Sequence, residues 1–455
     1  MLKTDFSRRS FLKKMGKTAA VSSLFLQSDS NNQASGTTSS LSGQSEISQK
    51  MPVHLSGNDV IKIALLGCGP RGSGAAVDAL TVDSNTQLIA MGDLQPHRIS
   101  NNCSVMTEMF GKERIKVSEE TSFIGFDACH KICQTEADVV IIALPTYFHP
   151  HYMKRCLEAG KHVFCEKTHA VDSRGVRMVL ESQQLAREKG LALVSGLCWR
   201  YDSGAIETMK RIHDGAIGEI VALQETCNCG GLRCLPRLDN QDELSYQIQD
   251  WFDFFWLSCD LPGLNLVHHL DKASWAMKEE HPIRCWGMGG RQTRIGKSYG
   301  DVWDHHAVVF EYANGVRLHA FCRQQDGTTP EVSDRYFGSK GYCDLLSYKI
   351  FGEQAWALNE PPSDRFKLEH LAMLNSIRNG TPINNGLYMA QSSLMGIMTT
   401  WACYTGQMID WDEAMNNNVI LGPENPDSLL TNPVSPVCPD EDGNYPQPVP
   451  GITRF

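Results

Sequence analysis

The feature that most constrains this chain is a glycine-rich turn placed directly after an apolar run. Val60 to Leu66 is β-branched and apolar and has the length of a strand. Gly67-Cys68-Gly69-Pro70-Arg71-Gly72 follows at once, and Ser73 to Leu80 reads as a helix. In this G-x-G-x-x-G pattern Gly67 permits the tight turn, Gly69 lets the backbone approach a pyrophosphate, and Gly72 lets the helix pack on the strand. The pattern predicts a dinucleotide-binding domain, with Arg71 inside the binding turn.

A carboxylate follows at the end of the next predicted strand. Gln87 to Met91 is apolar and ends in Gly92-Asp93. Asp93 stands near the spacing of the acidic residue that binds the adenosine ribose in such domains. A carboxylate there repels a 2′-phosphate, and Leu94 rather than an arginine follows it. We therefore expect NAD, rather than NADP, as the cofactor.

Strands and helices alternate along the whole segment from 60 to 196. The predicted elements are the strands Ala137–Leu144, Lys161–Cys165 and Leu191–Ser195 and the helices His149–Ala159 and Ser173–Lys189. This rhythm predicts a parallel sheet with crossover helices, a Rossmann fold. Loops at the carboxyl ends of the strands hold cofactors in such sheets. We accordingly assign four residues there to the cofactor site: Pro145, His149, Glu166 and Lys167.

The first residues resemble a targeting signal rather than part of a folded domain. Ser7-Arg8-Arg9-Ser10-Phe11-Leu12-Lys13 precedes a short apolar stretch, Ala19 to Leu26. Paired arginines in this setting are typical of a twin-arginine export signal, and the other interpretation is the basic start of an amphipathic helix. Residues 28–58 are rich in Ser, Gln, Asn and Gly and predict a flexible linker. The expected location is the periplasm.

Charge and length exclude several classes of protein. The chain has 455 residues, enough for two domains, and a formal net charge of −10. A net-acidic chain without a long basic run argues against nucleic acid as a partner. No apolar stretch reaches the roughly 18 residues of a membrane span. A small molecule is the partner that we expect.

A longer ordered set of motifs is similar to a known family. It comprises Gly67-x-Gly69-x-x-Gly72, Asp93, Pro145-x-x-x-His149, Ala159-Gly160-Lys161-His162-Val163, Glu166-Lys167, Trp199-Arg200-Tyr201, Gly218-Glu219-Ile220, Val267-His268-His269-Leu270-Asp271 and Tyr404-Thr405-Gly406-Gln407. The set resembles the Gfo/Idh/MocA oxidoreductases, the family of glucose–fructose oxidoreductase and inositol dehydrogenase. The tail, with Asp410-Trp411-Asp412-Glu413-Ala414, resembles the exported branch of that family.

The resemblance implies an α/β chain: an N-terminal Rossmann parallel sheet and a C-terminal α+β domain with a large, open, mainly antiparallel sheet. The expected divisions are 1–58 (signal and linker), 59–200 (Rossmann domain), 201–365 (sheet domain), 366–408 (helices that pack back on the Rossmann domain) and 409–455 (irregular tail). The resemblance also implies a carbohydrate substrate at the domain interface and a homo-oligomer formed through the sheet domain.

The resemblance assigns the chemistry to two side chains. Lys167 would bind and polarise the reacting hydroxyl, and His268 would be the general acid/base. His268 and Asp271 share one helix face, whereas the adjacent His269 points elsewhere. The substrate-binding residues that we predict are Arg200, Tyr201, Asn265 and Asp271.

Three positions depart from the family pattern, and the first is Thr146, which replaces a common Asn or Asp after the third strand. Thr168 stands where the family has proline after Glu-Lys, so a trans bond is expected before it, because a cis bond to a non-proline residue costs about 2.5–4 kcal/mol. Leu264 stands where a carboxylate often precedes the histidine by four residues, which leaves His268 without that partner. Asn265 is a nearby polar residue, but it cannot take a proton.

Other clusters offer competing uses. His268, Asp271, His305 and His306 could surround zinc, but their spacing matches no zinc motif. Cys227, Cys229 and Cys234 form one irregular trio, whereas a zinc ribbon needs two C-x-x-C pairs. We therefore predict no metal. The aromatic run Trp251–Trp256, read at strand spacing, has one face that could stack on a sugar, although core packing is the commoner use.

Three functions stay open on the sequence. The leading one is an exported NAD-dependent oxidoreductase that acts on a sugar or glycoside hydroxyl and keeps its NAD bound, since free NAD should be scarce outside the cytoplasm. The second is a glycosidase or lyase that oxidises its substrate transiently and then reduces it again. The third is a sugar sensor without catalysis, against which the retained Lys167 and His268 argue.

Overall fold

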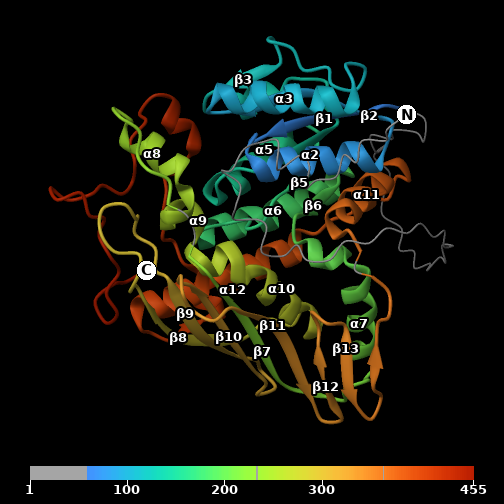
Figure 1. The fold of residues 1–455 in the computed structure, drawn as a ribbon, viewed down its shortest axis with the longest axis vertical. Coiled ribbons are helices and arrows are strands. Elements are labelled where there is room, and N and C mark those ends of the chain that lie inside the picture. Colours follow the sequence, from blue (N-terminus) through green and yellow to red (C-terminus); the bar gives the residue numbers. More distant parts are fainter. Residues whose placement is uncertain (1–58, 232–233, 362) are drawn as a thin grey trace.

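The structure is a computed structural model that describes residues 59–231, 234–361 and 363–455. The predicted export signal and linker, residues 1–58, lie outside the described residues. Figure 1 shows two sheets. The smaller sheet, coloured blue to green, lies above the larger one, and long helices lie between them.

The smaller sheet has six parallel strands in the order β3-β2-β1-β4-β5-β6. The strands are β1 (Ile61–Leu66), β2 (Thr86–Asp93), β3 (Ser122–Ile124), β4 (Val139–Ile142), β5 (His162–Cys165) and β6 (Leu193–Ser195). Their helices are α2 (Pro70–Val82), α3 (Pro96–Phe110), α4 (Ala128–Cys133), α5 (His149–Glu158) and α6 (Ser173–Lys189). The central strands are buried on both faces, as their apolar runs predict. The order reverses between β1 and β4, where such sheets bind dinucleotides. The predicted Rossmann sheet is confirmed.

The larger sheet has nine strands in the order β14-β13-β12-β11-β7-β10-β9-β8-β15. Only β7 and β10 pair in parallel; the other pairs are antiparallel. The strands are β7 (Ile220–Cys229), β8 (Arg284–Gly290), β9 (His305–Glu311), β10 (Arg317–Gln324), β11 (Glu331–Gly338), β12 (Gly341–Asp344), β13 (Lys349–Gly352), β14 (Trp356–Ala357) and β15 (Ile409–Asp410). The predicted α/β class with an open, mainly antiparallel second sheet is confirmed.

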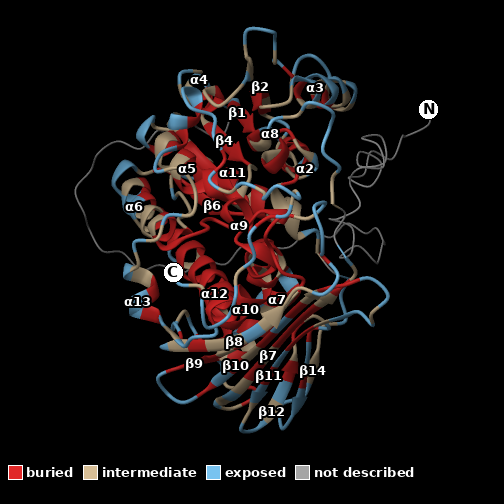
Figure 2. Cartoon of the chain, turned by 90° about the vertical axis from the view of Figure 1, so that its left-hand side faces the viewer, coloured by how far each residue is buried: buried red, intermediate tan, exposed pale blue. Residues whose placement is uncertain are grey.

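Helices fill the space between the two sheets. The long α12 (Gly386–Thr405) is buried on nearly every side and contacts α6, α10 (Val267–Ala276), β8 and β9. The helix α11 (Arg365–Arg378) packs on α2 of the smaller sheet. In Figure 2 the buried residues run without a break from the Rossmann strands through α12 to the inner face of the large sheet. The remaining helices are α7 (Ser203–His213), α8 (Glu243–Gln249), α9 (Phe255–Ser258) and α13 (Trp411–Asn416).

The aromatic run Trp251–Trp256 does not form a strand, so the predicted strand spacing is wrong. Trp251–Asp253 is a 3₁₀ turn, and α9 begins at Phe255. The side chains of Phe254, Phe255 and Trp256 are buried, and the Trp256 indole donates to Gln247 Oε1 at 2.7 Å. Core packing, rather than a sugar-stacking face, is what the run provides. Within the described residues, no helix combines the length and the apolar character needed to cross a membrane.

Candidate active site

The glycine turn between β1 and α2 has the shape of a pyrophosphate cradle. Gly67 has φ +93°, and a Cβ there would lie 2.3 Å from the Ala143 carbonyl oxygen. A Cβ on Gly72 would lie 1.9 Å from the carbonyl oxygen of Gly67. Over Gly69 the space is open, with Arg98 Nη1 the nearest group at 3.9 Å. The turn therefore leaves room for a phosphate beside the N–H groups at the start of α2, as NAD requires.

Two substitutions in this turn should separate packing from cofactor binding. Gly72→Ala should lower both thermal stability and NAD affinity, because its methyl group would overlap a backbone oxygen. Gly69→Ala should fold normally, because its methyl group meets open space, yet it should weaken NAD at least ~10-fold, about 1.4 kcal/mol, by occupying the phosphate position. Thermal melts and NAD titration of both variants test this. A Gly69→Ala protein that binds NAD normally would contradict the placement of the phosphate.

The carboxylate of Asp93, the last residue of β2, binds both the glycine turn and the backbone that follows β2. It accepts hydrogen bonds from the Cys68 N–H at 2.7 Å and from the Gln95 N–H at 2.9 Å. The side chain therefore lies at the mouth of the turn, where the adenosine ribose is expected. Arg98, in the first turn of α3, is a neighbour of this turn that no motif marks. Its only sequence signal is its position shortly after Asp93.

The predicted cofactor residues Arg71 and Glu166 bind each other. Arg71 Nε donates to the Glu166 carboxylate, and Arg71 Nη2 donates to Glu369 Oε1 at 3.0 Å. The guanidinium also stacks over Phe366, 4.7 Å from the ring centroid. These contacts join the start of α2 to the end of β5 and to α11. The pair therefore braces the cofactor edge of the sheet from three elements.

His149 is a buried link between two loops at this edge. Its Nδ1 donates to the Thr168 carbonyl at 2.5 Å, and its Nε2 accepts from the Leu144 N–H at 3.2 Å. Pro145 opens the 3₁₀ turn that leads into His149 and is half-buried. Burial lowers the pKa of His149 to about 4. The neutral ring thus holds the loop after β4 against the residues that follow Lys167.

This histidine makes stability depend on pH. The unfolded chain takes up the proton near pH 6.5, whereas the folded chain resists it until about pH 4. The contribution of His149 to the free energy of unfolding should be fully present above pH 6.5 and should be lost as the pH drops toward 4. It amounts to about 3 kcal/mol, at 1.36 kcal/mol per pKa unit. Urea unfolding across this range should show a shallower slope for His149→Gln than for the wild type. His97→Gln, at an exposed position on α3, is the matched control for the substitution itself.

Lys167 points from the end of β5 to the segment before α10. Its Nζ donates to the Leu264 carbonyl oxygen, and the Thr168 hydroxyl donates to the Gly263 carbonyl. Leu264 thus contributes its backbone where the family pattern has a carboxylate. Burial lowers the pKa of Lys167, against the opposing charge of Glu166. The Lys167–Thr168 bond is cis, so the expected trans bond is wrong; Thr168 is held on one side by Gly263 and on the other by His149.

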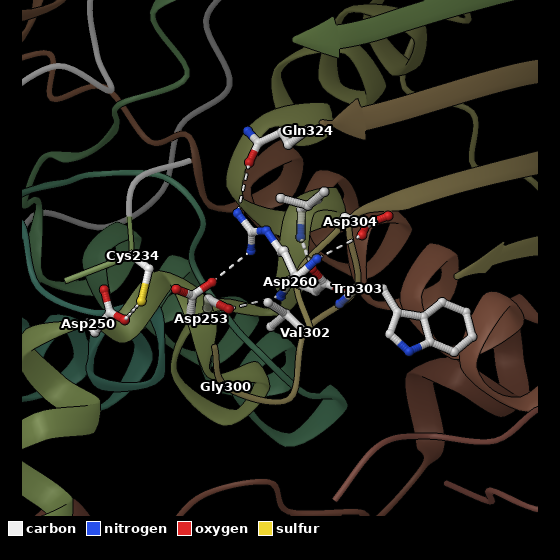
Figure 3. A network of polar contacts seen from close by, with 12 residues as sticks. Cys234, Asp250, Asp253, Asp260, Gly300, Val302, Trp303, Asp304 and Gln324 are labelled. Carbon is white, nitrogen blue, oxygen red and sulfur yellow. Dashed lines mark hydrogen bonds and ion pairs between the residues drawn. The ribbon is translucent and has the colours of Figure 1, made fainter. Parts of the chain in front are cut away.

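Asp260 anchors the segment that meets Lys167. Its buried carboxylate accepts from the Leu261 N–H at 2.6 Å and the Tyr404 hydroxyl at 2.6 Å. It also accepts from the Trp303 N–H at 3.1 Å, and Figure 3 labels Asp260 and Trp303. His306 Nε2 lies 3.0 Å from the same carboxylate. Burial raises the pKa of Asp260, but His306 and these hydrogen bonds outweigh it and keep the pKa below its ordinary value. No sequence motif marks this residue, because its partners come from distant elements.

The two adjacent histidines lie in different surroundings. His268 is half-buried, and its Nδ1 has no hydrogen-bond partner among the described residues. Burial and then the charges of Lys167 and Lys272 hold its pKa well below the ordinary value. His269 is fully buried and donates from Nδ1 to Asp334 on β11. The charge of Lys167 acts on His268, whereas His269 is held by Asp334 in the core.

A buried charged cluster lies beneath His268. It contains Glu225 on β7, Asp334 on β11, and His269 and Lys272 on α10. Lys272 pairs with Asp334 and stands 4.3 Å from the centroid of the Trp199 ring. Glu225, His269 and Asp334 have ligand atoms close enough for a metal ion, but the Lys272 ammonium already supplies the cation. The cluster therefore anchors α10 to the sheet.

Arg200 and Asp271, predicted to bind substrate, bind each other. Arg200 Nε and Nη2 donate to the two Asp271 oxygens at 2.9 and 2.8 Å, and Nη1 donates to Glu279 at 2.5 Å. The guanidinium lies between the Trp275 and Tyr388 rings. Because both charges are buried and satisfied, the structure assigns them to an ion pair that joins α10 to the end of the Rossmann domain.

The other two predicted substrate residues differ. Tyr201 donates its hydroxyl to Asn385 Oδ1 at 2.9 Å, which ties it to the start of α12. Asn265 is half-buried, three residues before His268, and stays a prediction. Arg365, at the start of α11, was not selected from the sequence. It lies over Trp199, 4.0 Å from the ring centroid, and its charge helps to lower the pKa of His268.

The metal alternatives weighed on the sequence are not assembled in the described part of the chain. His305 Nδ1 bonds Asp304 at 2.7 Å, and His306 faces Asp260. Cys234 lies apart from the β7 cysteines and donates to Asp250 at 3.5 Å, in the acidic network drawn in Figure 3. In that network Asp253 pairs with Arg294 at 2.8 Å. This network organises the loop before β9.

The fold and the edge of the sheet together define a class of protein. A glycine cradle, an acid at the end of β2 and a lysine just after β5 are the parts of a dinucleotide-binding site at this edge of the sheet. Residues 61–197 match the model of the GFO_IDH_MocA family, described as an oxidoreductase family with an NAD-binding Rossmann fold. The match covers the cofactor domain and names the same family that the sequence resemblance indicated.

Individual relatives are distant. Glycosyl hydrolase family 109 protein 1 of Bacteroides fragilis is 24% identical over 44% of this chain and 37% of its own length. Inositol 2-dehydrogenase 2 of Saccharopolyspora erythraea is 24% identical over 63% of this chain and 73% of its own. The chain spans well under half of the first curated relatives that it matches. The structure of scyllo-inositol dehydrogenase from Lactobacillus casei with NAD(H) and scyllo-inositol is similar in fold, with TM-score 0.58, 18% identity, and 77% of this chain and 99% of that chain covered.

Proposed function

We propose that this protein is an exported NAD-dependent oxidoreductase that acts on a hydroxyl of a sugar or glycoside and keeps its NAD bound. One observation carries the proposal: Lys167, at the cofactor edge of the Rossmann sheet, meets the segment that bears His268. The sugar-related names of the relatives support the substrate class. Export rests on the twin arginines, Arg8 and Arg9.

The two side chains divide the work on the substrate hydroxyl. NAD, when bound, supplies the hydride acceptor. Lys167, whose pKa burial lowers, donates a hydrogen bond to the hydroxyl oxygen and holds it at the cofactor edge. The imidazole of His268, whose pKa burial lowers so that the ring is neutral, accepts the hydroxyl proton directly or through a water. The reverse transfer returns the proton when a ketone is reduced.

Native mass spectrometry of protein purified without added cofactor tests the tight binding. We expect one NAD per chain that survives buffer exchange. Titration of cofactor-free protein should then show tighter binding of NAD than of NADP, because the Asp93 carboxylate repels a 2′-phosphate. An empty site with fast NAD exchange would indicate an ordinary dehydrogenase that takes its NAD from solution. Tighter binding of NADP than of NAD would overturn the role of Asp93.

A redox-neutral glycosidase is the second candidate. The similarity to a glycosyl hydrolase family 109 protein favours it. Such an enzyme would release an aglycone with no net NADH, whereas a dehydrogenase would accumulate NADH or pass the hydride to a second sugar. Simultaneous measurement of aglycone and NADH with one glycoside substrate separates the two.

A homo-oligomer formed through the large sheet is part of the proposal. Its outer face exposes aromatic side chains, among them Phe337, Tyr342 and Phe351. Tyr342 and Phe351 stack with ring centroids 4.6 Å apart across β12 and β13. Apolar patches of this kind mark contact surfaces. Size-exclusion chromatography with light scattering tests the state, and a monomer at micromolar concentration would contradict it.

A further inference from the structure

Three cysteine side chains converge in the Rossmann domain, outside the Lys167–His268 site. Cys129 and Cys133 are four residues apart on α4 and therefore share one face of that helix. Cys156 lies on α5, which packs against α4 (Figure 2). The three sulfur atoms all lie within 4.8 Å of one another. In the described part of the chain no other three thiols converge in this way.

The spacing is that of a thiolate metal site. With metal–sulfur bonds of about 2.3 Å and angles between tetrahedral and trigonal, neighbouring sulfurs stand about 3.8–4.0 Å apart. Cys133 Sγ and Cys156 Sγ are 3.9 Å apart. A disulfide would need about 2.05 Å, so these atoms would have to approach by nearly half their present separation. A disulfide would also use only two of the three thiols.

Arg155 precedes Cys156 on α5 and brings a positive charge close to the three sulfurs. Arg155 has a buried Nη1 without a partner among the described residues, while its Nη2 bonds Asp427 at 2.6 Å. Three thiolates around a divalent ion leave one net negative charge, which a guanidinium offsets. Cys129 and Cys156 are buried, and the half-buried Cys133 gives an ion access from solvent.

We propose that Cys129, Cys133 and Cys156 bind one thiophilic metal ion of the Zn²⁺ type through three sulfur atoms. Soft thiolate ligands select such ions over Mg²⁺ or Ca²⁺. The fourth position is left to water, since the group contains three protein ligands. The ion joins the six-residue α4 to α5 and so stabilises the Rossmann domain at a place separate from the predicted catalytic pair.

Metal titration of the full-length protein tests the site. The protein is stripped with chelator and kept reduced, and Zn²⁺ binding is measured by competition with a chromophoric chelator and Cd²⁺ binding by its thiolate charge-transfer absorption. We expect one high-affinity ion per chain, proton release on binding, and a higher melting temperature. Cys133→Ser should weaken Zn²⁺ more than ~10-fold and diminish the Cd²⁺–thiolate absorption.

The chain has 16 cysteines, so a matched control is needed. Cys103→Ser changes a partly buried thiol on α3, outside the trio, and should bind Zn²⁺ as the wild type does. Equal Zn²⁺ affinity in Cys133→Ser and wild type would overturn the proposal, as would a Cys133–Cys156 disulfide found by peptide mapping of protein isolated without reductant. Should Cys129→Ser or Cys156→Ser fail to fold, the comparison of Cys133→Ser with Cys103→Ser still decides, because Cys133 is only half-buried.

Discussion

Replacing Lys167 or His268 with alanine is expected to lower turnover at least ~10²-fold while the protein still folds and binds NAD. Lys167 holds the substrate oxygen in the proposed reaction, and the His268 imidazole takes the proton. Lys167 follows β5 and His268 lies on α10, and both side chains are half-buried, so neither loss empties the core. Steady-state rates, NAD titration and thermal melts of the two variants measure the effect.

His269→Ala is the matched control, because it removes the neighbouring imidazole from the buried cluster. It should lower the melting temperature because Asp334 loses its hydrogen bond from His269 and keeps only Lys272 as a charged partner, a loss that typically costs about 1–3 kcal/mol. At a temperature where all variants are folded, it should keep more activity than His268→Ala. If His269→Ala loses more turnover at equal folded fraction, the assignment of the two histidines is reversed.

Asp260→Asn should destabilise the protein strongly, by about 3–5 kcal/mol, the usual cost of breaking a buried charged network. The amide would replace an acceptor with a donor that faces the Trp303 N–H and the Tyr404 hydroxyl. Urea unfolding measures the loss. Below the melting temperature turnover should also fall, because Asp260 sets the backbone whose Leu264 carbonyl holds Lys167.

Asp250→Asn is the control for this prediction. Burial, with the nearby Asp253, raises the pKa of Asp250 to about 8, so its side chain is already neutral at pH 7. An amide there should therefore change stability far less than the same amide at position 260. Equal losses for the two variants would show that burial alone, and not the charged network of Asp260, sets the cost.

The Rossmann domain could be predicted from sequence because its signals are local. A run of apolar residues, a glycine turn and a helix follow one another within 25 residues, roughly, and each depends on neighbours in the chain. The steric need at Gly67 and Gly72 follows from backbone contacts that the motif itself creates. The class of the second sheet came from the resemblance, since its strands pair across long separations.

The active-site assignments were predictable only to the level of residue type. The motif placed Lys167 and His268 in one family pattern, and the structure brings their segments together. The sequence motif could not reveal that Arg200 and Asp271 neutralise each other, because the two residues lie 71 positions apart and meet through packing. The aromatic run near Trp256 has a pattern that predicts a strand, but tertiary packing around Gln247 makes it helical.

The amino-acid order thus determined the cofactor fold, the glycine cradle and the candidate lysine and histidine, since hydrophobic periodicity and turn chemistry act over short distances. Tertiary structure alone decided which histidine the core holds, which charges are already paired, where Asp260 anchors the segment opposite Lys167, and that Cys129, Cys133 and Cys156 meet. These outcomes depend on contacts between distant elements, and burial sets both the partners and the pKa of each group there.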